Sequence, residues 1–290
     1  MHHVTDRRPA ARRTIPITAV PLLVLAIAGI AQGQVTTVTF DDGAEGWVGP
    51  GGPGGSTFIE STGGNPGANL RTVFNNFGIS FTNGASEAFL GDYTTADEIE
   101  ISIDIRVDEI GFFGQAVSRP WLVELRDFDT ASGGYPYTSV WYLFANISAA
   151  ANGSWQTYSV AFDPSSETLP SGWGGTGAED PDTFEPILPP NVTFAEVLSG
   201  VDVAVFTTLQ PGFFFGFTDF DLRLDNITIA RNGGEPSPDL DGNGTVDGAD
   251  LTILLSAWGD CAKKAPCPAD LDGDGGVDGA DLTILLATWE

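Results

Sequence analysis

Two copies of one acidic, glycine-rich segment near the C-terminus constrain this chain more than any other feature of its sequence. Residues 239–250 read DLDGNGTVDGAD, and residues 270–281 read DLDGDGGVDGAD. The likeness extends further, because 16 of the 20 residues from Asp239 to Trp258 recur from Asp270 to Trp289. The carboxylates of each copy would repel one another at short range and oppose folding unless a cation joined them.

The spacing of these segments matches the twelve-residue calcium loop of an EF-hand. Such a loop has oxygen ligands at positions 1, 3, 5, 9 and 12, a backbone carbonyl at position 7 and glycine at position 6. Both copies satisfy every position, with Asp at position 12 and with Gly244 and Gly275 at position 6. We therefore expect two Ca²⁺ ions, and we expect the second loop, which has five carboxylates against four, to bind more strongly.

A helix is predicted after each loop but not before it. Leucines and a tryptophan recur at i, i+3, i+4 and i+7, which indicates an amphipathic helix; they are Leu251, Leu254, Leu255 and Trp258, then Leu282, Leu285, Leu286 and Trp289. The prolines at positions 236, 238, 266 and 268 forbid the entering helix of an ordinary EF-hand. The sequence thus predicts two loop-then-helix units.

These units resemble the type I dockerin module over about residues 236–290. The resemblance implies a small all-α domain at residues 239–290 that folds only with calcium and attaches a secreted protein to a cohesin receptor. Dockerins are commonly borne by proteins of polysaccharide breakdown. The resemblance implies the ligands Asp239, Asp241, Asn243, Thr245 through its carbonyl, Asp247 and Asp250 in the first loop, and Asp270, Asp272, Asp274, Gly276 through its carbonyl, Asp278 and Asp281 in the second.

Two positions depart from the dockerin pattern. Dockerins that bind cohesins use hydroxyl or bulkier side chains at loop positions 10 and 11, whereas this chain has Gly248-Ala249 and Gly279-Ala280. The sequence therefore leaves two kinds of partner open: a cohesin-like receptor or another surface receptor.

The other end of the chain predicts export. Four arginines, at positions 7, 8, 12 and 13, precede the apolar run 22–31, and small residues then offer a cleavage site near Gly33-Gln34. The apolar run is much shorter than the roughly 20 residues that span a bilayer. Residues 1–33 are therefore interpreted as a signal peptide, the mature protein as secreted or at the cell surface, and no membrane span is expected.

Composition excludes several classes of function. After residue 33 the chain has 38 acidic and 8 basic residues, a net charge of −30, which is unsuited to nucleic acid. The only histidines, His2 and His3, lie in the signal segment, so no Ser-His-Asp triad, Cys-His pair or histidine-ligated zinc can form. Cys261 and Cys267 are the only cysteines, and in an exported chain they predict a short disulfide.

Residues 35–230 have the pattern of a β domain. Isoleucines and a valine alternate with polar residues from Glu98 to Val107, as in a strand with one buried face. Further strands are predicted at 121–125, 140–147, 157–162, 201–207 and 222–229, and one short helix at 194–198 with a capping box from Thr193 and Glu196. We predict a mainly β, jelly-roll-type sandwich whose first and last strands pair. Residues 231–238 are the predicted linker to the calcium units.

The β domain resembles galactose-binding-like sandwiches of carbohydrate-binding modules and, more locally, laminin B (laminin IV) domains. The segments that carry the second resemblance are Gly63-Gly64-Asn65-Pro66-Gly67, Phe89-Leu90-Gly91-Asp92-Tyr93, Phe194 with Val197-Leu198, and Leu224-Asp225-Asn226. Both resemblances imply a non-catalytic role in binding extracellular glycan or another surface component.

Candidate ligand residues in the β domain are aromatic. Trp121, Trp141 and Trp155 lie in strand-like runs and are expected in the core. Trp173, in the glycine-rich segment 171–177, and Trp47 are the candidates for stacking on sugar rings. Asp41, Asp42 and Asp225 approach one another if the terminal strands pair. They are therefore candidate ligands of a further structural ion, with ordinary polar turn residues as the alternative.

Three functions remain open from the sequence. The first is a secreted calcium-binding protein with a non-catalytic glycan-binding sandwich, linked to polysaccharide breakdown. The second is a glycoside hydrolase with the same layout, acting on O-glycosyl bonds, since two carboxylates suffice for that reaction. The third is a structural cell-surface or matrix protein. No catalytic residue is assigned.

Overall fold

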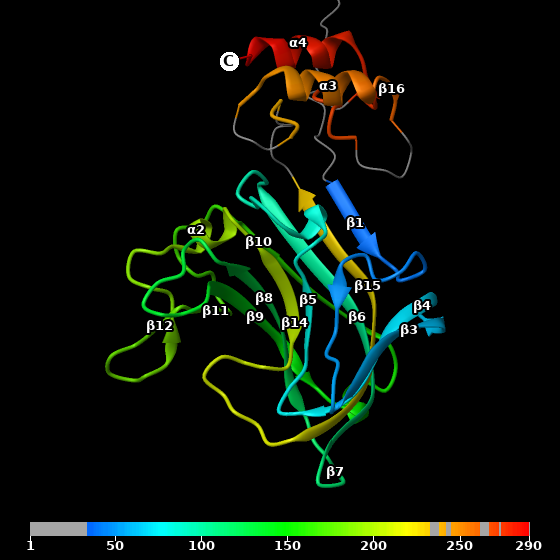
Figure 1. Ribbon diagram of the computed structural model, residues 1–290, viewed down its shortest axis with the longest axis vertical. Helices are drawn as coiled ribbons and strands as arrows, with labels where there is room; N and C mark the ends of the chain where they lie inside the picture. The colour runs from blue at the N-terminus through cyan, green and yellow to red at the C-terminus, as the bar shows by residue number, and fades with distance from the viewer. Residues whose placement is uncertain (1–33, 233–237, 242–244, 262–266, 273, 290) are drawn as a thin grey trace, which may run out of the picture.

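The computed structural model describes residues 34–232, 238–241, 245–261, 267–272 and 274–289, which form a β-sandwich and a small helical unit (Figure 1). The predicted signal peptide, Asn243 and all of the predicted linker except Arg231, Asn232 and Pro238 lie outside these ranges. No helix in the described ranges is long and apolar enough to cross a membrane.

The first sheet contains both terminal strands of the sandwich. Its order is β10-β6-β15-β4-β3, with β1 paired to β15 and β7 to β6. The pairing of β1 with β15 confirms the prediction that the first and last strands are neighbours. The bounds are β1 Gln34–Val38, β3 Gly55–Gly64, β4 Gly67–Asn76, β6 Glu98–Phe112, β7 Gln115–Ala116, β10 Gln156–Phe162 and β15 Thr218–Asn232.

The second sheet faces the first across the core and has the order β11-β9-β8-β14-β5-β2. Every pairing within the two sheets, over the residues that the structure describes, is antiparallel. The prediction of a mainly β, two-sheet sandwich is therefore confirmed. The bounds are β2 Trp47–Val48, β5 Ser80–Asn83, β8 Arg119–Asp127, β9 Thr138–Ile147, β11 Trp173–Thr176 and β14 Val203–Thr207, and a small separate hairpin pairs β12 Ala178–Glu179 with β13 Pro186–Ile187.

Alternation of apolar and polar residues builds the core. On β6, the side chains from Ile99 to Val107 that alternate toward the second sheet are buried, and Phe206 and Leu125 meet them from that sheet. Burial of each such side chain stabilises the fold by about 1.5–3 kcal/mol. The predicted short helix is α2, Phe194–Leu198, with the capping box of Thr193 and Glu196 in place. One further α-turn, α1 Ala149–Asn152, and a 3₁₀ turn, η1 Glu87–Phe89, lie in connections.

Strands β3 and β4 were not predicted, and their composition explains why. β3 is an edge strand with exposed residues on both sides, so it lacks the alternation that marks a half-buried strand. Its partner β4 buries Ala68, Leu70 and Phe74, but glycine and asparagine at both ends are typical of turns rather than strands.

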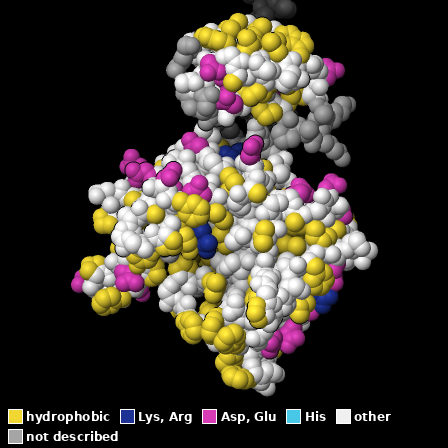
Figure 2. Space-filling model, in the orientation of Figure 1, with side chains coloured by type: hydrophobic (Ala, Val, Ile, Leu, Met, Phe, Trp, Pro, Cys, Tyr) yellow, Lys and Arg dark blue, Asp and Glu magenta, His cyan; other side chains and the backbone are white. Residues whose placement is uncertain are grey.

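The C-terminal unit contains the predicted pair of helices, α3 Gly248–Ser256 and α4 Gly279–Ala287, side by side in Figure 1. A two-residue ladder, β16 Gly259–Asp260 with β17 Gly276–Val277, joins the end of the first unit to the second loop. Only part of the predicted apolar stripe is core, because Leu254 and Leu285 are buried while other members of the stripe remain exposed. The exposed ones are Leu255, Trp258, Leu286 and Trp289, and Figure 2 shows hydrophobic side chains over these helices.

Candidate functional site

The two predicted calcium loops each gather carboxylates. Asp239, Asp241 and Asp250 each place one oxygen within 4.8 Å of the others. In the second loop the same holds for Asp270, Asp272 and Asp274. All six are expected ligands at positions 1, 3, 5 or 12. Position 5 of the first loop, Asn243, lies outside the described residues.

The last two expected ligands of each loop also begin the following helix. Asp247 is the N-cap of α3 and accepts the N–H of Ala249, while Asp250 closes a capping box by accepting the N–H of Asp247. Asp250 also accepts the N–H of Leu240 at 2.7 Å and of Asp241 at 3.0 Å. Asp278 and Asp281 repeat this arrangement at α4. Because one carboxylate serves loop and helix together, ordering of the loop and of the helix are coupled.

The electrostatics of the loops fit a divalent cation. Backbone N–H groups, first that of Asp247, hold the pKa of Asp250 below its ordinary value, so this carboxyl stays ionised. In the second loop, loss of hydration and then repulsion from Asp274, Asp281 and Asp270 raise the pKa of Asp272. The repulsion among these carboxylates is the part of this shift that a bound cation would relieve. Ca²⁺, a hard cation that prefers oxygen ligands, suits such a donor set.

The predicted disulfide between Cys261 and Cys267 is present, with Cα atoms 5.8 Å apart. It lies at the second loop, since the N–H of Asp270 donates to the carbonyl of Cys267 at 3.0 Å.

A third acidic cluster lies in the sandwich, on neighbouring strands of the first sheet. Asp104 of β6 and Asp225 of β15 are opposite each other in register and are 5% and 0% exposed. Asp104 accepts the side-chain N–H groups of Asn65 (2.9 Å) and Asn226 (2.7 Å). Burial first, and then the charges of Asp104 and Asp41, raise the pKa of Asp225. Among the described residues no basic side chain forms an ion pair with Asp104 or Asp225, so two buried acids face each other without a protein counterion.

This cluster contains Asp41 and Asp225 of the predicted trio Asp41, Asp42 and Asp225. Asp42 interacts electrostatically with Glu45. Asp104 is the third member of this cluster. In the sequence it is one of several polar residues that alternate along β6, so nothing there marks it as a candidate ligand. The glycines of the segment 63–67 explain the approach of the acids to the backbone: a Cβ on Gly64 would lie 2.6 Å from Oδ2 of Asp225, and one on Gly67 would lie 2.7 Å from Oδ1 of Asp41. These carboxylates are therefore cradled by backbone that only glycine can supply.

The structure buries both predicted sugar-stacking tryptophans. Trp173 is 9% exposed, on β11 opposite Tyr142, and its ring packs 4.7 Å from Phe162 and 5.0 Å from Phe194. The prediction of an exposed Trp173 is wrong, because its glycine-rich segment is a strand rather than a loop. Trp47 is 2% exposed and packs against Phe89 and Phe206.

The glycines beside Trp173 serve packing instead. A Cβ on Gly174 would lie 2.2 Å from the indole of Trp141, so the absence of a side chain makes room for that ring. Trp121 is buried as expected, whereas Trp141 and Trp155 are only half-buried.

Trp141 belongs to a polar and aromatic surface on the outer side of the second sheet. Two neighbouring rungs cross β8, β9 and β11: Glu124 is opposite Trp141 and Trp141 is opposite Gly174, while Arg126 is opposite Ser139 and Ser139 is opposite Thr176. We call the outward side chains of Glu124, Arg126, Ser139, Trp141 and Thr176 the Trp141 face.

Hydrogen bonds fix the charged side chains of the Trp141 face. Glu124, 4% exposed, accepts from Arg126 at 2.6 Å and from Ser139 at 2.7 Å. The guanidinium of Arg126 also stacks 4.3 Å from the ring of Tyr137. Burial, and then the charge of Glu124, raise the pKa of Tyr137. The indole Nε1 of Trp141 and Nε of Arg126 are buried without a hydrogen-bond partner. The face thus combines a half-buried aromatic ring with a carboxylate–guanidinium pair, whose carboxylate is oriented by the buried hydroxyl of Ser139.

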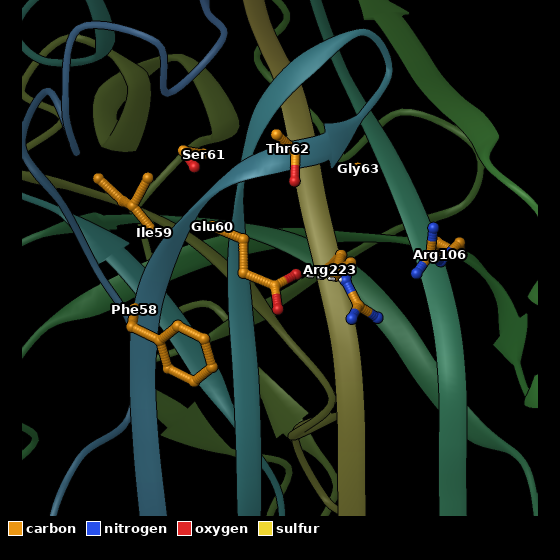
Figure 3. Close-up of a pocket in the computed structure, with 8 residues that line it drawn as sticks. All are labelled: Phe58, Ile59, Glu60, Ser61, Thr62, Gly63, Arg106 and Arg223. Atoms are coloured by element: carbon orange, nitrogen blue, oxygen red, sulfur yellow. Dashed lines mark hydrogen bonds and ion pairs between the residues drawn. The ribbon is translucent and has the colours of Figure 1, made fainter.

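The outer side of the first sheet has an open pocket of about 490 Å³, in which Glu60 of β3 points toward Arg223 of β15 (Figure 3). Its lining residues are Phe58, Ile59, Glu60, Ser61, Thr62, Gly63, Arg106 and Arg223. The ion pairs continue beyond the pocket in an alternating chain of Asp221, Arg71, Glu60, Arg223, Asp108 and Arg106. Because each arginine of this chain already faces a carboxylate, the pocket offers a ligand no unbalanced positive charge.

Comparison with known proteins yields only distant similarity. A scan against protein-family models and a search of curated proteins find no match. Among solved structures, the chain is similar to the family 11 carbohydrate-binding module from Clostridium thermocellum in complex with a β-1,3-1,4-mixed-linked tetrasaccharide, at 16% identity and a TM-score of 0.42, over 70% of this chain and 98% of that one.

Two further similar structures come from the same organism. The family 30 carbohydrate-binding module of the cellulosomal cellulase Cel9D-Cel44B has 12% identity and a TM-score of 0.36, over 68% of this chain and 93% of that one. The CBM22-1–GH10 modules of endo-1,4-beta-D-xylanase 10B, complexed with xylohexaose, have 14% identity and a TM-score of 0.42, over 77% of this chain and 36% of that one. This chain therefore spans about a third of that xylanase chain.

Proposed function

We propose that the protein is a secreted, non-catalytic polysaccharide-binding protein with a calcium-dependent, dockerin-type C-terminal module. The observation that carries the glycan-binding part is the Trp141 face, where an indole lies over Gly174 beside the hydrogen-bonded pair of Glu124 and Arg126. The C–H side of a pyranose stacks on an aromatic ring, and charged planar groups bind its hydroxyls with strong hydrogen bonds. The pair is oriented before a ligand arrives, which lowers the entropic cost of binding.

Retention on insoluble polysaccharides tests this function. We expect the full-length protein to bind one such polymer and Trp141→Ala to weaken that binding roughly ten-fold or more, since loss of a central aromatic side chain costs about 2 kcal/mol. Trp155→Ala is the matched control, because Trp155 is half-buried next to β10 of the other sheet, where Arg106 stacks on it.

Reducing-end release, measured on the same samples, separates binding from hydrolysis. Retention without release supports the proposal, and release supports a glycoside hydrolase acting on O-glycosyl bonds. Absence of both retention and release favours a structural surface or matrix protein. If Trp141→Ala and Trp155→Ala reduced polysaccharide retention equally, the Trp141 face would not be the binding site.

The C-terminal part of the proposal is supported by the paired carboxylate clusters and their capping boxes. Two Ca²⁺ ions are held by the acidic residues of the two loops, with Thr245 and Gly276 contributing carbonyls. Exposed Leu255, Trp258, Leu286 and Trp289 supply apolar surface for a cohesin-like or other receptor. Calorimetric titration of the metal-free protein should show two ions in these loops, with a gain of helical circular dichroism. A helix signal that is already complete in chelator would contradict this part.

A third ion is proposed in the sandwich, held by Asp104, Asp225 and Asp41. It would balance the two buried carboxylates, which have no protein counterion among the described residues. Asp104→Asn should lower the number of bound ions by one.

A further inference from the structure

The disulfide contacts the second calcium loop from one side through Cys261. Strand β16, which ends just before this cysteine, pairs with β17 so that Gly259 is opposite Val277 and Asp260 is opposite Gly276. The N–H of Cys261 then donates to the carbonyl of Gly275 at 3.0 Å. Gly275, Gly276 and Val277 are positions 6, 7 and 8 of the loop. Cys261 therefore extends the segment that holds the backbone around the expected carbonyl ligand.

Cys267 contacts the first residue of the same loop. Its carbonyl accepts the N–H of Asp270, the ligand at position 1, at 3.0 Å. The Sγ of Cys261 also lies 3.7 Å from Oδ2 of Asp270. Asp270 in turn accepts the N–H groups of Asp274 (3.1 Å) and Gly275 (2.9 Å). The disulfide consequently links the chain that fixes position 1 to the chain that fixes positions 6–8.

We infer that the Cys261–Cys267 disulfide positions the second calcium loop, so that reducing it weakens Ca²⁺ binding there and leaves the first loop unchanged. This inference rests on the proposed calcium module. With the bond closed, the start of the loop at position 1 and its middle at positions 6–8 are held at a set separation before the ion arrives. With two thiols, the ion must order the segment from Gly259 to Cys261 as well as the loop.

The first loop is an internal control because its sequence is almost the same. Thr245 and Val246, its positions 7 and 8, lie in no strand of the described residues, whereas the matching Gly276 and Val277 form β17. Val246 is 9% exposed and Val277 is 1% exposed, in agreement with the extra cover over the second loop. A change of redox state should therefore alter Ca²⁺ binding at the second loop and leave the first loop unchanged.

The size of the effect follows from the short ring that the bond closes. A crosslink lowers the conformational entropy of the unfolded chain, which corresponds to about 2 kcal/mol or more of free energy. Part of this stabilisation applies to the calcium loop, because the disulfide contacts it. We expect the Kd of the second loop for Ca²⁺ to rise about ten-fold on reduction. Position 1 and positions 6–8 should lose order together, since the disulfide joins the segments that contact them.

The test is calorimetric Ca²⁺ titration of the full-length protein, oxidised and after treatment with a phosphine reductant. Asp241→Ala isolates the second loop and Asp272→Ala isolates the first. The expected result is a weaker second site in the reduced protein, recovery on reoxidation, and the same weakening in Cys261→Ser/Cys267→Ser without any further effect of reductant. Hydrogen exchange at the amides of Cys261 and Asp270 in the calcium-loaded protein should accelerate on reduction.

The outcomes separate the inference from the proposal beneath it. Two ions bound with equal affinity in both redox states overturn the inference alone. An equal loss at both loops also overturns it, because the disulfide would then support the whole unit. An oxidised protein that binds no Ca²⁺ in either loop overturns both this inference and the calcium module.

Discussion

At the scale of single residues, Gly275 shows how the backbone limits a calcium loop. Its φ of 95° lies in the left-handed region, and an added Cβ would meet nothing within 4 Å. Alanine there would be strained by the backbone alone, at about 1–2 kcal/mol. We expect Gly275→Ala to raise the Kd of the second loop about ten-fold in calorimetric titration.

Gly279→Ala is the matched control for that substitution. Gly279 is the first residue of α4 and also has open space around an added Cβ, but its φ is not in the left-handed region. Alanine should leave Ca²⁺ binding unchanged and stabilise the helix by up to about 1 kcal/mol. Equal weakening by both alanines would show that side-chain volume, rather than backbone strain, governs the loop.

Trp173 carries a second prediction at this scale. Its ring fills the space between Phe162, Phe194 and Tyr142, so Trp173→Ala should lower the free energy of unfolding by about 3–5 kcal/mol in urea denaturation. Trp155→Ala, which loses one stacked arginine, should cost about 1 kcal/mol or less. If Trp173→Ala lost polysaccharide retention while its stability stayed unchanged, Trp173 would be a ligand-binding residue.

The residues that could be predicted are those whose role depends on close neighbours in the chain. The carboxylate spacing of the predicted calcium loops and the capping box of Thr193 are local. The structure brings three carboxylates of each loop together and forms the capping box. The burial of Trp173 depends on β11 pairing with β9, some thirty residues away, and its flanking glycines looked like a loop. The Trp141 face was missed for the same reason, since Glu124, Ser139 and Thr176 meet only through strand register.

At the scale of elements, the alternation of apolar and polar residues predicted strands with one solvent-exposed face. It did not predict the edge strand β3. β6, β8, β9, β10, β14 and β15 all overlap predicted ranges, whereas β3 is exposed on both sides and carries no such signal. What holds the inner strands to this edge is partly ionic. Arg71 of β4 and Arg223 of β15 both donate to Glu60 of β3, which ties three neighbouring strands through one carboxylate.

The ion pairs of Glu60 predict a pH dependence. Burial alone would raise the pKa of Glu60, but hydrogen bonds from Arg223 and Arg71 outweigh it and lower that pKa. A carboxyl whose pKa is lower in the folded state stabilises the fold above its unfolded pKa, about 4.3, and loses that contribution as pH falls through the folded value. Glu60→Gln should therefore cost about 1 kcal/mol at pH 7 and little at pH values below the folded pKa.

Urea denaturation at several pH values measures the difference between wild type and Glu60→Gln. Glu100→Gln, at an exposed position of β6, is the control and should differ little from wild type throughout. A cost for Glu60→Gln that stays constant down to acid pH would show that shape, rather than charge, makes Glu60 important.

At the scale of the whole molecule, two separate apolar cores indicate two units of stability. The sandwich core and the small core around Leu254 and Leu285 share no residue. Among the described residues, the second core contains six buried apolar residues, too few to hold a unit of about fifty residues without help. We therefore expect scanning calorimetry in Ca²⁺ to show two transitions, of which the C-terminal one vanishes in EDTA.

The sandwich should respond to calcium differently, because its large core keeps it folded, and the ion proposed at Asp104 and Asp225 would only add stability. At a Ca²⁺ concentration 100 times Kd, binding adds about 2.7 kcal/mol, which corresponds to a rise in Tm of roughly 5–10 °C for a domain of this size. Asp104→Asn should remove that rise while the C-terminal transition keeps its response, since the two sites share no residue. A sandwich transition in the wild-type protein at one temperature in both EDTA and Ca²⁺ would mean that no ion binds at this cluster. Because the pKa of Asp225 is raised, lowering the pH, rather than adding metal, would then stabilise the sandwich.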